Sequence, residues 1–72
     1  MLSNATYNLM ETAAVISKGL HRYPRFEEDA LACQACKQIW SEMKLADDKQ
    51  LEKIVGHLKE HLDRDERAVR AA

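Results

Sequence analysis

The sequence predicts a small all-α domain. Two Gly and one Pro in 72 residues are too few for a turn-rich β-sandwich. Apolar residues recur every three or four positions along the chain, which is the period of an amphipathic helix. Hydrophobic residues make up 46% and charged residues 32%, a balance that argues against disorder. We therefore expect one domain over 1–72, a three-helix bundle with helices over roughly 3–22, 25–44 and 48–68.

The first helix is predicted from one apolar stripe and a signal at each end. Ser3 or Asn4 can cap its start by accepting a backbone N–H bond. Pro24 is expected to end it, because proline lacks the N–H that a helix interior needs and disfavours helix at the residue before it. The stripe has spacings of four and three residues: Leu9, Ala13, Ile16, Leu20 and Tyr23.

The second and third helices follow from two further stripes. Proline is favourable as a first helical residue, so the second helix is expected to begin at Pro24 or Arg25. Its stripe consists of Phe26, Ala30, Cys33, Cys36, Ile39, Trp40 and Met43. The stripe of the third helix consists of Leu51, Ile54, Val55, Leu58 and Leu62.

The junction between these two helices leaves an alternative open. Leu45–Asp48 can form a turn, with Asp47 as N-cap and Gln50 completing a capping box. However, positions 36, 40, 43, 47, 51, 54, 58 and 62 keep helical phase across it, with Asp47 as the one polar intruder. The alternative is a helical hairpin in which a short first helix folds against one helix of about 45 residues. A partner chain would then cover its long stripe.

Length predicts self-association and the class of function. A domain this short buries only about 60% of its unfolded surface, so a lone monomer is marginal. We expect a non-catalytic interaction or structural protein that acts through an apolar helical face, in a homo-oligomer or with a protein partner. The predicted core and interface residues are Phe26, Ile39, Trp40, Met43, Leu51, Ile54, Leu58 and Leu62.

Charge argues against several other partners. Eleven basic and twelve acidic residues are interspersed, for a net charge of −1, so we expect no nucleic-acid partner. The chain has no polybasic run and no apolar stretch of about 20 residues, so we expect no membrane partner. It lacks the pattern of a signal peptide, which predicts the cytoplasm. No small-molecule substrate is evident.

Two short motifs raise metal chemistry as an alternative function. The first is Cys33-Gln-Ala-Cys36, and the second is the pair His57 and His61. If the chain turns near Ala46, the two pairs lie level on antiparallel helices and form a Cys₂His₂ zinc set. We therefore expect no cofactor, with zinc as the alternative. A redox role for the thiols is disfavoured for two reasons. The predicted helix places them in its interior rather than at its N-terminus, and the βαβ context of thioredoxin-like motifs is absent.

No catalytic arrangement is predicted. His57-Leu-Lys-Glu60-His61 fits the H-x-x-E-H pattern of inverted zinc proteases, but the chain offers no third ligand or room for a substrate groove. A di-iron carboxylate site needs Glu-x-x-His, which is absent from the sequence. We therefore expect that the protein is not an enzyme.

Overall fold

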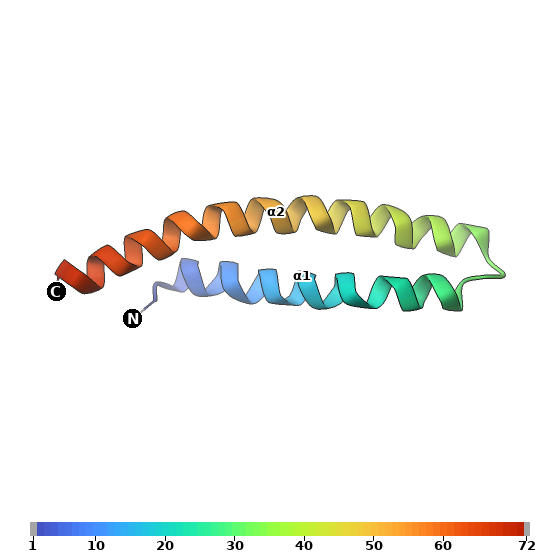
Figure 1. Ribbon diagram of the computed structural model, residues 1–72, viewed down its shortest axis with the longest axis horizontal. Coiled ribbons are helices and arrows are strands. Elements are labelled where there is room, and N and C mark those ends of the chain that lie inside the picture. The colour runs from blue at the N-terminus through green and yellow to red at the C-terminus, as the bar shows by residue number, and fades with distance from the viewer. Residues whose placement is uncertain (1, 72) are drawn as a thin grey trace.

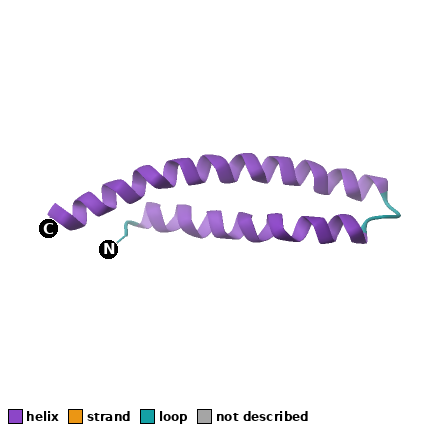
Figure 2. Cartoon of the chain, viewed as in Figure 1, coloured by secondary structure: helices purple, strands orange, loops and turns teal. Residues whose placement is uncertain are grey.

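The computed structural model describes residues 2–71 and shows two antiparallel helices joined by a short turn (Figure 1). Helix α1 runs over Asn4–Asp29 and helix α2 over Gln34–Ala71. The all-α prediction is confirmed, and the described residues are helix and loop (Figure 2). The three-helix bundle over 3–22, 25–44 and 48–68 is wrong. The hairpin alternative has the right architecture, although its turn lies elsewhere. Met1 and Ala72 of the predicted domain lie outside the described residues.

Helix α1 passes through Pro24, where we predicted its end. Proline in a helix interior removes one backbone hydrogen bond and costs about 3 kcal/mol. Pro24 itself is exposed on α1. The residues around it compensate, because Tyr23 and Phe26 contact Trp40 of α2. Tertiary packing therefore overrides the local signal. The start of α1 is as predicted, since the Ser3 side chain accepts the Thr6 N–H at 3.2 Å.

The turn occupies 30–33 and uses neither glycine nor proline. The Ala30 N–H bonds the carbonyls of Phe26 and Glu27, at 3.1 and 3.2 Å, and closes α1. Cys33 directly precedes α2: its carbonyl accepts the Lys37 N–H at 3.1 Å, and its Sγ accepts the Cys36 N–H at 3.3 Å. A cysteine therefore occupies the N-cap position, where serine or threonine is usual.

Helix α2 is continuous across 45–48, so the turn predicted there is wrong. Asp47 is not a cap. It faces α1 from the middle of α2, and the Tyr23 hydroxyl donates a hydrogen bond to its carboxylate. This cross-helix hydrogen bond satisfies the carboxylate that interrupts the apolar stripe. The helix can therefore continue through Asp47 without leaving a polar group unpaired.

The helices meet along a single seam with a seven-residue repeat, as in an antiparallel coiled coil. The α1 side is the predicted first stripe, extended by Thr6 and Ala30. Only Thr6, Tyr23 and Ala30 are buried among the described residues, and of these Thr6 is fully buried. The α2 side is partly exposed throughout and consists of Trp40, Asp47, Leu51, Ile54, Leu58, His61 and Asp65.

The hairpin is long and thin. Its extents are 59 × 16 × 13 Å and its radius of gyration is 16.7 Å. A compact domain of this length has a radius of gyration of about 11 Å. Among residues 2–71, neither helix combines the length and apolar character that crossing a membrane requires.

Candidate functional site

An aromatic cluster holds the closed end of the hairpin. Tyr23 stacks on Trp40 with ring centroids 6.1 Å apart, and Phe26 lies 5.0 Å from Trp40. Tyr23 is only 6% exposed. Its hydrogen bond to Asp47 raises the pKa of the phenol, with smaller contributions from burial and the carboxylate charge. Two of the predicted core residues, Phe26 and Trp40, therefore join the helices.

A polar cluster holds the open end. The Ser3 backbone N–H donates to the Asp65 carboxylate at 2.8 Å, across the two helices. The Ser3 and Thr6 hydroxyls are hydrogen-bonded at 2.8 Å, and Thr6 is fully buried. The Ser3 N–H, then the Thr6 hydroxyl, lowers the pKa of Asp65. Sequence reasoning missed this cluster, because it depends on which residue of α2 lies opposite the start of α1.

One flank of the seam remains apolar near the open end. Val55, Leu62 and Val69 are seven residues apart and form one exposed stripe on α2. Leu2 lines the same surface pocket as Leu62 and Val69. Met10 is also exposed, one residue after the seam residue Leu9 on α1. We name this surface the open-end flank: Leu2, Met10, Val55, Leu62 and Val69.

The other predicted interface residues fall into two groups. Leu51, Ile54 and Leu58 lie in the seam and are partly exposed. Ile39 and Met43 are exposed near the closed end, on either side of Trp40 in the sequence. The predicted set is therefore divided between the contact of the two helices and the outer surface, and it does not form one continuous face.

The structure does not bring together the four predicted zinc ligands. The predicted meeting of the two pairs requires a turn near Ala46, where α2 is continuous. Cys36 and His57 lie on the same helix, so at 1.5 Å per residue they are about 30 Å apart. Within the described part of the chain, no three His, Cys, Asp or Glu residues are placed to hold a metal ion. The Cys₂His₂ arrangement is therefore wrong.

The H-x-x-E-H segment forms a local cluster on α2. The Nε2 atoms of His57 and His61 are 3.1 Å apart, and the His57 Nδ1 is 3.2 Å from a carboxylate oxygen of Glu60. The Glu60 carboxylate therefore contacts His57. It does not face an open coordination position beside the two histidines, as a catalytic base would. Two nitrogens this close can share an ion, but a catalytic zinc needs a third protein ligand, which residues 2–71 do not place here.

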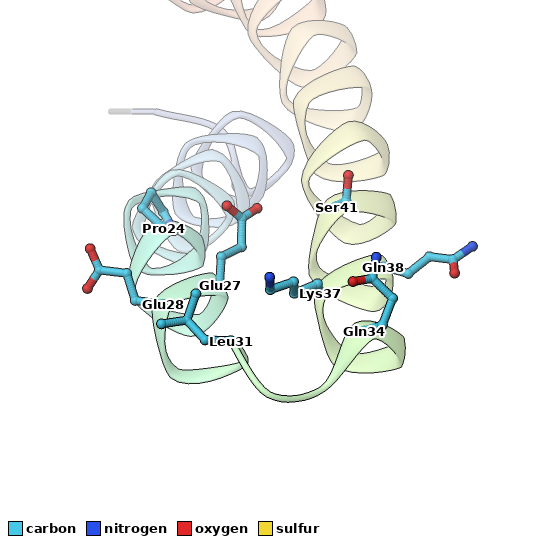
Figure 3. A pocket seen from close by; sticks show the side chains of 8 residues that line it. All are labelled: Pro24, Glu27, Glu28, Leu31, Gln34, Lys37, Gln38 and Ser41. Carbon is cyan, nitrogen blue, oxygen red and sulfur yellow. The ribbon is translucent and has the colours of Figure 1, made fainter.

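A shallow polar groove crosses the closed end on the side opposite the aromatic cluster. Its lining combines acidic, amide and hydroxyl side chains with Leu31 and Pro24. The Lys37 side chain extends from α2 toward α1 across it (Figure 3). The groove has no histidine or cysteine in its lining and no enclosed wall, so it suggests a solvated surface.

Comparison with protein families, curated proteins and solved structures finds no match to this chain. The geometry of its own residues therefore carries the functional conclusion.

Proposed function

We propose that the hairpin is a self-associating helical module without catalysis of its own, and that two copies join through the open-end flank. The observation that supports this is its excess surface. The chain exposes 5777 Å². A compact monomer of 8.3 kDa exposes about 4,600 Å². The difference, about 1,200 Å², exceeds the roughly 800 Å² that each partner buries in a standard interface.

A second copy of the chain can cover this surface, whereas no other part of the same hairpin can. The seam residues Leu51, Ile54 and Leu58 are only half-buried in the hairpin. A hairpin has no further helix to cover them, because two helices pack along only one line. Another hairpin laid along the open-end flank covers both the exposed stripe and the near edge of the seam.

The charges beside the flank permit this contact. Glu52, Lys59 and Glu66 border the Val55–Val69 stripe on the outer side of α2, and they alternate in sign. Two copies related by a two-fold axis present the same patch to each other. An alternating border allows opposite charges to pair across the axis, whereas a border of one sign would repel its copy.

Native mass spectrometry of the full chain, purified without a metal-affinity tag, tests the proposal. We expect a dimer or a higher even assembly at micromolar concentration, with the same subunit number by light scattering. A monomer at every concentration up to the millimolar range would contradict the proposal.

A further inference from the structure

The two cysteines lie together at the tip of the hairpin, in an arrangement that the sequence did not predict. Cys33 is the N-cap of α2 and Cys36 is the third residue of its first turn. The Cys33 Sγ accepts the Cys36 backbone N–H at 3.3 Å, so it lies at the positive end of the helix. The position inside a helix, one of the two reasons for disfavouring redox chemistry, is therefore removed, whereas the βαβ unit of thioredoxin-like proteins is absent from the described residues. Both thiols are free and partly exposed.

The two thiols are electrostatically unequal. The Cys36 thiol, followed by the Cys36 and Ala35 backbone N–H groups, lowers the pKa of Cys33. The contact with Cys33 and the charge of that thiolate raise the pKa of Cys36. Thiol pKa values fall at helix N-termini and in Cys-x-x-Cys motifs, where reactive cysteines are found. Cys33 is therefore the more acidic thiol of the pair.

The surroundings leave the pair accessible. A surface pocket of about 320 Å³ opens beside it. Among charged groups, Asp29 of α1 lines this pocket, with Arg25 3.7 Å from its carboxylate, and Lys37 follows one turn after Cys33 on α2. The pocket lining consists of Phe26, Asp29, Ala30, Cys33, Cys36 and Trp40.

We propose that Cys33 and Cys36 are a redox-active dithiol that exchanges with the disulfides of low-molecular-weight thiols. The Cys33 thiolate attacks one sulfur of the disulfide RSSR, a mixed disulfide forms on Cys33, and RS⁻ leaves and takes up a proton. The Cys36 thiol then loses its proton and attacks the Cys33 sulfur, which releases the second RSH. The dithiol is oxidised to a Cys33–Cys36 disulfide and RSSR is reduced to two RSH.

A metal role is the weaker interpretation of the same pair. Two thiolates satisfy only half of a structural zinc site, and the described residues place no third ligand beside them. Oxidation needs no further group, because both sulfurs come from one chain. The proposal is also independent of self-association, since the pair lies at the closed end and the open-end flank lies at the other.

Redox titration of the full chain tests the proposal. The reduced protein is equilibrated in buffers with graded ratios of oxidised to reduced glutathione, and the exchange is quenched with acid. The remaining thiols are then alkylated, and the mass of the intact chain is measured. We expect one transition from a doubly alkylated chain to a chain that has lost two hydrogens and takes up no label. The emission of Trp40, which lines the same pocket, should change with the same midpoint. A mixture of intermolecular disulfides, or a dithiol that persists in fully oxidised buffer, would overturn the proposal.

Alkylation and two matched variants separate the roles of the thiols. In the native chain at pH 7, iodoacetamide should modify Cys33 at least about fivefold faster than Cys36, as mapped by peptide mass. Cys36→Ser should stop at the mixed disulfide with one glutathione, whereas Cys33→Ser should react slowly. Circular dichroism checks that both variants remain helical. If a variant does not fold, the alkylation rates of the two thiols in the native chain still test which thiol attacks first. Equal rates at the two thiols, or one zinc ion held by the four thiols of two chains, would refute it.

Discussion

Replacing Leu62 by alanine tests where two hairpins meet. Leu62 is the central residue of the stripe on the open-end flank, and it is 39% exposed in the single chain. That exposed part is what a second copy can still bury. Full burial of a leucine side chain contributes about 1.5–3 kcal/mol.

The size of the effect follows from that fraction and from symmetry. The unburied part of Leu62 corresponds to about 0.5–1 kcal/mol per copy once the methyl group that alanine retains is subtracted. A two-fold interface contains the residue twice. Leu62→Ala should therefore weaken the dimer by about 1–2 kcal/mol, which is about a 5- to 30-fold rise in Kd.

Sedimentation equilibrium over a range of protein concentrations measures this change directly. Leu45→Ala is the matched control, because Leu45 is more exposed, at 62%, but lies on the outer face of α2 beside Lys49 and Glu52. We expect less than a twofold change in Kd for the control. A Kd that rises as much for Leu45→Ala as for Leu62→Ala would refute the assignment of the flank. So would a dimer whose Kd does not respond to Leu62→Ala.

Three further predictions concern the hairpin itself. Pro24→Ala should restore a backbone hydrogen bond and raise the free energy of unfolding by up to about 3 kcal/mol in urea titration, whereas a helix that began at this residue would gain almost nothing. Thermal unfolding followed by circular dichroism should show a maximum of stability between about pH 4 and pH 10. The lowered pKa of Asp65 stabilises the fold above the usual aspartate range, and this is lost as the pH falls. The raised pKa of Tyr23 stabilises it below the usual tyrosine range, and this is lost as the pH rises through the folded-state value. Tyr23→Phe should reduce the loss at high pH, leaving the part that comes from the raised pKa of Tyr7 beside Glu11, and should leave the loss at low pH. In the Tyr23→Phe background Asp47→Leu should be stabilising rather than destabilising, because the Asp47 carboxylate then faces an apolar ring. Independence of the melting temperature from pH over this range would contradict the two cross-helix contacts.

Periodicity alone determined much of this protein. The spacing of Leu9, Ala13, Ile16 and Leu20 identifies the inner face of α1. The unbroken phase from Cys36 to Leu62 identifies α2 as one helix, as in the hairpin alternative. These patterns are readable from sequence because side chains three and four apart share a face of any α-helix.

Local breakers misled where tertiary contacts outweighed them. Pro24 and Asp47 both read as helix boundaries, yet both lie inside helices. The aromatic contacts beside Pro24 and the Tyr23 hydroxyl on Asp47 supply what the local sequence lacks. The real turn, at 30–33, carries no residue that sequence rules treat as a turn signal.

Only the tertiary structure decided the register of the hairpin, and the register decides the chemistry. Moving the turn from 45–48 to 30–33 separates Cys36 from His57 and places Cys33 at the N-terminus of a helix. It also places Asp65 opposite Ser3. Helical period states which residues share a face, but it does not state where the chain reverses. That depends on which contacts across the seam are most favourable, and these form only between residues far apart in the sequence.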